Sequence, residues 1–392
     1  MRFENGQTGA NGERSRVHNR QLVLGRILSA GVMGRAEIAR ASGLSTQAVS
    51  KIIATLEADG LLMQDGTRSA GRGLPAALYA VNPDGGYALG FEVRPDAILG
   101  AILDLRGTQI ATARERVIAA GPQETATIIT AMRDALAAKA GIDATRILGA
   151  GVALPGPFGR TGLSEEASAL PGWEGVDPVA LIGDALDLPV TVENDANAAA
   201  MAERIGGAAE GHATYGYLYF GAGLGLGLLS GGHLVTGAFG NAGEIGHLPL
   251  AGDGVLLERA VSRLSLVARL EAAGVDAPDI DTLGALARAD HPIVRQWIAD
   301  AAGPLARAVH VVETLFDPET VILGGAMPEE ILRDLVQAAE LPASSISNRT
   351  DRTVPRLICG RTGRLVAAGG AAALVLNRLF TPRFAPVAPT LQ

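Results

Sequence analysis

The order of short elements near the N-terminus constrains this chain most. Apolar residues recur at helical spacing over residues 17–28, a second short helix is expected over 35–42, and a third begins at Ser45, a favourable N-cap residue. Gly31 and Gly43 separate them. Two helices joined by a tight glycine turn form the helix-turn-helix pattern, which places its second helix in the major groove of DNA.

Two short strands, 61–64 and 77–81, are expected to follow, and the loop between them carries arginines on flexible Gly and Ser residues. This order predicts a winged helix-turn-helix whose arginines face phosphates or a minor groove. The residues expected to contact DNA are Ser45, Thr46, Gln47, Ser50, Lys51, Arg68 and Arg72. A small helical packing module with a solvated loop is the alternative.

The charge of the chain is divided in the same way. The net charge is −8, but residues 1–80 carry +4 and the rest −12, so we expect only the N-terminal part to meet a polyanion. We divide the chain into a disordered tail (1–15), a DNA-binding domain (16–82) and a large domain (83–392).

The rest of the composition excludes several classes of protein. A single cysteine, Cys359, rules out an internal disulfide and a four-cysteine metal site. The polar N-terminus does not resemble a signal peptide, and the most apolar stretches, 217–229 and 365–376, are shorter than the ~20 residues of a membrane helix. We expect a cytoplasmic protein with no membrane partner.

The large domain has a repeated layout. Strands are expected over 87–93, 98–104 and 108–116, followed by a helix over 122–140 and a further strand. A second strand–glycine turn–strand unit begins near Tyr215. Two halves that each open with a hairpin predict a duplicated α/β architecture with a cleft between two lobes.

Specific motifs in this domain resemble the ROK family of repressors, open reading frames and kinases. The segments VENDANAAAMAE, GNAGEIGHLPL and DPETVILGG occur in the family's order, and the likeness spans most of residues 80–380. The preceding winged helix-turn-helix is similar to the repressor branch, which includes xylose repressors. The resemblance implies a two-lobed, actin-like fold of the sugar kinase and RNase H type.

The resemblance also implies a sugar site. A sugar presents many hydroxyls, so its site needs converging carboxylates, an amide and an imidazole. The matching positions are Asn194, Asp195, Glu244, His247 and Glu258, with Asp195 at the position of the kinases' base. Structural roles remain open for three of them: a helix cap for Asp195, a core histidine for His247 and a helix-start carboxylate for Glu258.

Departures from the family pattern argue against catalysis. The kinases' first phosphate loop reads Asp-x-Gly-Gly-Thr, whereas this chain has Glu92–Asp96, with the bulk of Arg94, no N–H donor at Pro95 and a negative charge at Asp96. Ala222 replaces the threonine usual in the second loop. We therefore expect a sugar sensor and no enzyme; an active sugar kinase with a DNA-binding head is the alternative.

The expected partners follow from these assignments. The cysteine cluster that binds zinc in many relatives is missing after His247, so no metal and no cofactor is expected. The predicted partners are operator DNA and a small sugar or sugar derivative. We also expect a homodimer, or a dimer of dimers, that reads a palindromic operator. A regulator whose cleft binds a protein instead of a sugar is a further alternative.

Overall fold

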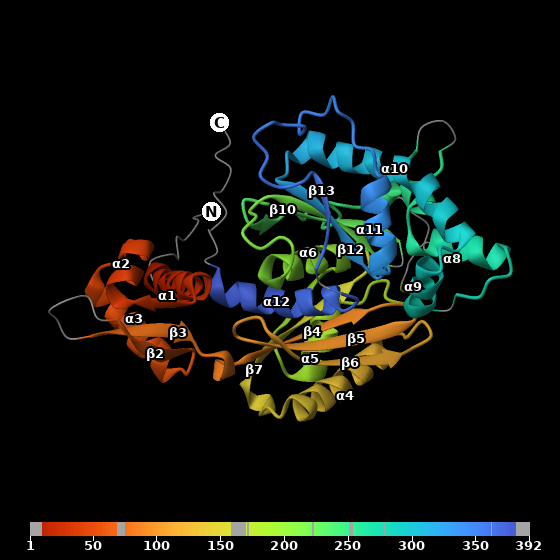
Figure 1. The fold of residues 1–392 in the computed structure, drawn as a ribbon. Helices are drawn as coiled ribbons and strands as arrows, with labels where there is room; N and C mark the ends of the chain where they lie inside the picture. The colour runs from red at the N-terminus through yellow and green to blue at the C-terminus, as the bar shows by residue number, and fades with distance from the viewer. Residues whose placement is uncertain are drawn as a thin grey trace, which may run out of the picture.

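The N-terminal head is an arrangement of helices on a small antiparallel sheet (Figure 1). The computed structural model describes residues 10–68, 75–157, 170, 172–221, 223–250, 254–277, 279–361 and 363–381. The head consists of α1 (Ala10–Ala30), β1 (Val32–Gly34), α2 (Arg35–Ser42), α3 (Thr46–Ala58), β2 (Leu62–Arg68) and β3 (Ala76–Val81), with strand order β1-β3-β2.

Local sequence signals position α2 and α3. Gly43 ends α2 in the left-handed conformation (φ 69°), which a residue without Cβ adopts at little cost. Ser45 then caps α3, because its side chain accepts a hydrogen bond from the backbone N–H of Ala48 at 3.2 Å. Val49 and Ile53 on the inner face of α3 are fully buried, as the helical spacing predicts.

Two parts of the head differ from the sequence-based prediction. Helix α1 begins at Ala10 and so extends into the segment 1–15 that was expected to be a disordered tail, while residues 1–9 lie outside the described part. A helix anchored by its later turns extends at little further cost, and no proline interrupts this segment. Strand β1 was also missed, because its three residues pair only with the distant β3.

The first lobe follows the head. It comprises the 3₁₀ turns η1 (Pro83–Gly85) and η2 (Ala144–Arg146), strands β4 (Tyr87–Val93), β5 (Ala97–Asp104), β6 (Gln109–Arg116), β7 (Ile147–Leu154) and β8 (Val190–Asn194), and helices α4 (Pro122–Ala140), α5 (Pro178–Leu186) and α6 (Asp195–Gly206). Its sheet has the order β6-β5-β4-β7-β8. The β4-β5-β6 meander is antiparallel, and β7 and β8 join it in parallel.

The second lobe repeats this plan. It contains β9 (Tyr215–Phe220), β10 (Leu224–Ser230), β11 (His233–Leu234), η4 (Ile245–His247), α7 (Leu257–Ala260), α8 (Arg263–Ala272), α9 (Ile280–Arg288), α10 (Pro292–Phe316), β12 (Thr320–Gly325), α11 (Glu329–Ala338), β13 (Leu357–Cys359) and α12 (Val366–Phe380). The order β11-β10-β9-β12-β13 again joins an antiparallel meander to parallel strands. The expected duplicated α/β architecture is confirmed.

Helices α6 and α12 lie between the two sheets and pack directly on each other (Figure 1). Small residues allow this close approach, because a Cβ on Gly370 would lie 1.7 Å from the carbonyl oxygen of Ala198. Strand β4 approaches α12 in the same way: a Cβ on Gly90 would lie 1.9 Å from the carbonyl oxygen of Ala368. The abundant Ala and Gly of the sequence therefore form the tightest helix contacts of the large domain.

Helix α12 also joins the large domain to the head. Its Leu376 and Phe380 share one apolar cluster with Val23 and Ile27 of α1. Gln21 Nε2 donates a hydrogen bond to the carbonyl oxygen of Arg378 at 2.7 Å. Figure 1 shows α12 running from between the lobes to the side of α1. In the described part of the chain, no helix combines the length and apolarity that crossing a bilayer requires.

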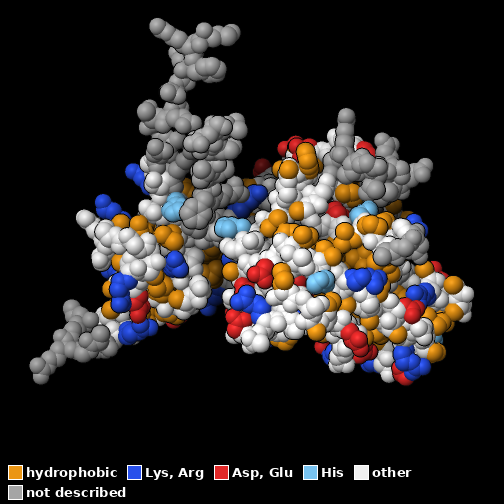
Figure 2. Space-filling model, turned by 90° about the horizontal axis from the view of Figure 1, so that it is seen from above, with side chains coloured by type: hydrophobic (Ala, Val, Ile, Leu, Met, Phe, Trp, Pro, Cys, Tyr) orange, Lys and Arg blue, Asp and Glu red, His pale blue; other side chains and the backbone are white. Residues whose placement is uncertain are grey.

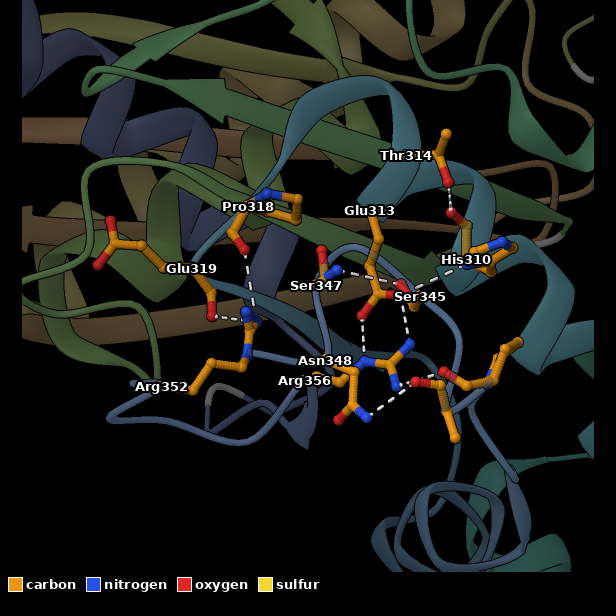
Figure 3. Close-up of polar contacts among 12 residues, drawn as sticks. His310, Glu313, Thr314, Pro318, Glu319, Ser345, Ser347, Asn348, Arg352 and Arg356 are labelled. Atoms are coloured by element: carbon orange, nitrogen blue, oxygen red, sulfur yellow. Dashed lines mark hydrogen bonds and ion pairs between the residues drawn. The ribbon is translucent and has the colours of Figure 1, made fainter. Parts of the chain in front are cut away.

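A buried ion pair fixes the outer edge of the second lobe (Figure 3). Glu313 of α10 is fully buried and accepts hydrogen bonds from Nε and Nη2 of Arg356, both at 2.6 Å. The hydroxyl of Ser345 donates a third at 2.9 Å. The segment between α11 and β13 is thereby held against α10.

Candidate functional site

The junction of β8 and α6 supplies the first two residues of the predicted sugar site. Asn194 caps α6, because its Oδ1 accepts hydrogen bonds from the backbone N–H groups of Ala196 at 2.9 Å and Asn197 at 3.3 Å. The capping role considered for Asp195 thus belongs to Asn194. The amide nitrogen Nδ2 of Asn194 remains turned toward Gly156, where a Cβ would lie 3.0 Å from it.

The remaining three residues come from the second lobe. Glu244 and His247 lie at the two ends of η4, and Glu258 lies in α7. Glu244 approaches the same Gly156 as Asn194, since a Cβ there would lie 2.1 Å from Glu244 Oε1. Burial raises the pKa of Glu244, with His247 lowering it and Glu258 raising it again. A Cβ on Gly246, which lies between Glu244 and His247, would be 3.2 Å from Glu258 Oε2, so the three residues lie together.

Glycines line this site because the acidic side chains come too close to the backbone for a Cβ. A Cβ on Gly221 would lie 3.2 Å from Asp195 Oδ2, and one on Gly223 would lie 2.6 Å from Glu258 Oε2. The glycines between β9 and β10 therefore leave room for the carboxylates of Asp195 and Glu258. The structure brings all five predicted sugar-site residues to the junction between the lobes, each of them half-buried.

Asp195 has an unusual protonation state. Burial, together with the negative charge of Glu92, raises the pKa of Asp195 from 3.8 to about 7, although the Ala196 N–H and Arg94 oppose the shift. The carboxyl group is thus near half protonation at neutral pH. A group in this state can donate a hydrogen bond to a sugar oxygen or accept one from a hydroxyl.

A cluster that we call the clasp adjoins Asp195. It consists of Glu92 and Arg94 of the first lobe, Tyr219 of the second lobe and the carbonyl of Arg364 before α12. Arg94 donates to both oxygens of Glu92, from Nε at 2.6 Å and from Nη2 at 2.8 Å. The Tyr219 hydroxyl donates to Glu92 Oε1 at 2.6 Å, and Arg94 Nη2 also reaches Arg364 O at 3.2 Å.

The clasp was not predicted from the sequence. There, Arg94 was expected only to add bulk that disrupts a phosphate loop, without a partner for its charge. Side chains two residues apart in a strand point to the same face, so the sequence could have predicted that Glu92 and Arg94 lie side by side. Their contact with Tyr219 spans 127 positions and carries no sequence signature. Arg94 occupies the turn where the kinases have glycines.

The residues predicted to contact DNA lie on the head, whose surface carries Lys and Arg side chains (Figure 2). Thr46, Gln47 and Lys51 are exposed at the start of α3, and Ser45 is exposed as its cap. Ser50 is half-buried and donates a hydrogen bond to the carbonyl of Thr46 at 2.9 Å. These residues form one face of α3.

The two arginines expected on the wing differ in their surroundings. Arg68 lies at the end of β2 and forms an ion pair with Glu37 of α2 at 2.5 Å, with more than half of its side chain exposed. It is therefore tied to the helix that precedes α3. Arg72 lies outside the described residues.

Comparison with known proteins places this geometry in a family. The ROK family pattern matches residues 89–378. An uncharacterized protein, y4fQ, of Sinorhizobium fredii is 30% identical over 89% of this chain and 88% of its own length. A xylose repressor of Bacillus spizizenii is 28% identical over 60% of this chain and 61% of the repressor.

Among solved structures, a ROK family transcriptional regulator described as a homolog of the Escherichia coli MLC protein shares the fold. It superimposes with a TM-score of 0.71 at 23% identity, over 94% of this chain and 98% of that one. The superposition includes the N-terminal head as well as both lobes. It supports the expected order of a winged helix-turn-helix followed by a two-lobed actin-like domain.

Proposed function

The chain belongs to the ROK family, and we propose that it is a DNA-binding repressor of carbohydrate genes whose two lobes bind a sugar without phosphorylating it. The observation that carries this proposal is the convergence of one amide, three carboxyl groups and one imidazole at the lobe junction. Within the described residues, the side chains of Glu244, His247 and Glu258 have no hydrogen-bond partner, so their polar atoms are available to hydroxyls.

The clasp supports binding without phosphoryl transfer. A phosphate loop needs backbone N–H groups and an uncommitted cation around the transferred group. Here Arg94 is already neutralised by Glu92, and Asp96 adds a negative charge to the same turn. An active sugar kinase with a DNA-binding head is the competing function, because the base position Asp195 is retained and its raised pKa suits proton transfer.

Helix α12 offers a physical route from the sugar site to DNA. Its N-terminal side meets Arg94 through the Arg364 carbonyl, and its C-terminal end is packed into the core of the head. A sugar that binds one arrangement of the lobes more tightly would favour the matching position of α12. In a homodimer, this would change the spacing of the two α3 helices on a palindromic operator.

The test combines ligand and DNA binding. The purified protein is screened by thermal shift against neutral and phosphorylated sugars, where a ligand at about 100 times its Kd adds about 2.7 kcal/mol of stability. The sugar that binds is then added to fluorescence anisotropy with a duplex selected from a random pool. We expect a sugar-dependent change in DNA affinity.

Two controls make the outcome decisive. Glu244→Gln should abolish the sugar-induced shift, whereas Glu210→Gln, which changes an exposed glutamate on the same lobe, should leave it intact. ATP consumption in the presence of the bound sugar would establish the kinase instead. No response to any sugar would favour a regulator whose cleft binds a protein.

A further inference from the structure

A second cavity lies beyond the clasp. It has a volume of about 950 Å³ and is bounded by β5 and β6 of the first lobe, the start of α12, and the N-terminal ends of α8 and α9. None of the five predicted sugar-site residues lines it. Its charged lining comprises the cations Arg94, Arg114, Lys139, Arg263 and Arg364 and the anions Asp96, Asp279 and Asp281.

Several of these charges are already engaged. Arg364 Nη1 pairs with Asp281 at 3.0 Å, and Asp279 caps α9 by accepting a hydrogen bond from the Thr282 N–H at 2.8 Å. Lys139 donates to the carbonyl of Thr112 at 2.9 Å, on the free edge of β6. These interactions account for part of the lining, and they leave an excess of positive charge.

Arg263 is the exception in this lining. Within the described residues its guanidinium has no ion pair, and its Nε is buried without a hydrogen-bond partner. Burial lowers the pKa of Arg263; Asp96 opposes this, while the nearby cations Arg94 and Arg114 lower it further. Asp96 is close enough to act on Arg263 but forms no ion pair with it, so an anionic ligand that contacts the guanidinium would stabilise this half-buried cation.

We propose that this cavity binds a phosphate monoester, with Arg263 as the principal contact to the phosphate. Arginine suits this role because its planar fork matches the geometry of phosphate oxygens. Leu99 and Leu103 give the cavity an apolar wall for the body of the ligand. The volume lies in the range of about 300–1,000 Å³ that small-molecule sites occupy.

The position of the cavity gives such a ligand a regulatory consequence. Arg364 and Leu365 line it and lead directly into α12, which reaches the head. Arg94 lines it as well and belongs to the clasp beside Asp195. A phosphate monoester would therefore act on the same helix as the sugar, from a separate site.

Calorimetric titration of the full chain tests this. Ribose 5-phosphate and AMP are the probes, so that a sugar phosphate and a nucleotide are distinguished, and ribose is the neutral reference. We expect at least one phosphate ester to bind and ribose to bind at least tenfold more weakly, since a charge-assisted pair to phosphate is worth about a factor of ten or more. Equal binding of ribose and ribose 5-phosphate, or binding of neither ester, would overturn the proposal.

Single substitutions test whether the phosphate ester binds in this cavity. Arg263→Gln should weaken the ester about tenfold or more, whereas Arg307→Gln, which removes an exposed cation from α10, should have no effect. Arg263→Gln should also raise the melting temperature without ligand, because it removes an unpaired cation, and this shows that the variant folds. Asp281→Asn frees Arg364 and should tighten binding.

The proposal is separable from the sugar-sensor function. Glu244→Gln should lose the sugar response but keep the affinity for the phosphate ester. Loss of both ligands in Glu244→Gln would mean that the ester occupies the sugar site and would overturn the second site. Unchanged ester affinity in Arg263→Gln would do the same, whatever the result with sugars.

Discussion

Glu92 and Glu313 are both buried against an arginine, one beside the predicted sugar site and the other at the outer edge of the second lobe. Glu313 receives two hydrogen bonds from Arg356 and one from Ser345 (Figure 3), with no other carboxylate among the groups that shift its pKa. Glu92 is equally well bonded by Arg94 and Tyr219, but its charge acts on Asp195.

This difference separates a structural ion pair from one at a binding site. The charges of Glu313 and Arg356 neutralise each other. Against the effect of burial, the hydrogen bonds from Arg356 and Ser345 hold the pKa of Glu313 below its usual value. The Glu92–Arg94 pair leaves a neighbouring carboxyl with a raised pKa and joins both lobes to α12. Buried charge by itself thus does not indicate a binding site; a neighbouring acid with a raised pKa is the stronger indication.

Breaking the outer pair should have a large effect on stability and none on ligand binding. Arg356→Ala leaves Glu313 buried without its counterion, and loss of one partner of such a pair costs about 3–5 kcal/mol. Urea unfolding measures this. Sugar affinity at low temperature should stay unchanged in the folded variant, because Arg356 is remote from the lobe junction.

The matched control for that prediction is an exposed pair. Arg349 pairs with Asp351 at 3.0 Å with most of both side chains exposed. Arg349→Ala should leave the free energy of unfolding nearly unchanged, because an exposed pair contributes little to stability. If the two variants lost equal stability, the distinction between the buried and exposed pairs would be wrong.

Breaking the clasp should affect ligand binding as well as stability. Arg94→Met leaves Glu92 buried with only its bond from Tyr219, as Arg356→Ala leaves Glu313 with only its bond from Ser345, so we expect a similar loss of about 3–5 kcal/mol. Because Arg94 lowers the pKa of Asp195, the variant should also raise that pKa further. Sugar affinity measured across pH should shift its midpoint upward; an unchanged midpoint would contradict the coupling.

Asp195 itself should make the stability of the protein depend on pH. Its pKa rises from the ordinary aspartate value of 3.8 to about 7 in the folded chain, so the folded state binds the proton more tightly than the unfolded state. Stability should therefore fall as the pH rises from about 4 to about 7 and then level off. Asp195→Asn removes this slope, and urea unfolding at pH 5 and pH 8 should show the variant gaining stability relative to wild type at pH 8.

The same contrast shows what the sequence can predict. Strand β4 and helix α4 have the predicted bounds, because an apolar run marks the strand and Pro122 and Gly141 mark the ends of the helix. The residues of the predicted sugar site lie in strand ends and turns with recognisable motifs, and the fold brings them together. Their roles in binding remain a proposal.

Contacts between distant segments could not be predicted in this way. The clasp joins Glu92 to Tyr219 across the lobes, and Glu313 meets Arg356 from positions 43 apart. The sequence analysis considered Asp195 as the N-cap of α6, whereas the cap is Asn194. Both residue types are favourable at an N-cap, and only the backbone geometry distinguishes the two positions. Periodicity specifies elements, whereas these pairs depend on how the elements pack.

The smallest expected effects compare the two hydroxyl groups that support the pairs. Ser345→Ala and Tyr219→Phe each remove one hydrogen bond to a buried glutamate that keeps its arginine, so each should cost about 1–2 kcal/mol. Only Tyr219→Phe should alter the sugar response, since the lost hydroxyl joins the second lobe to Glu92 and thus to Arg94. Urea unfolding gives the stability and DNA anisotropy with sugar gives the response. Equal responses in the two variants would mean that Tyr219 acts, like Ser345, only as part of the fold.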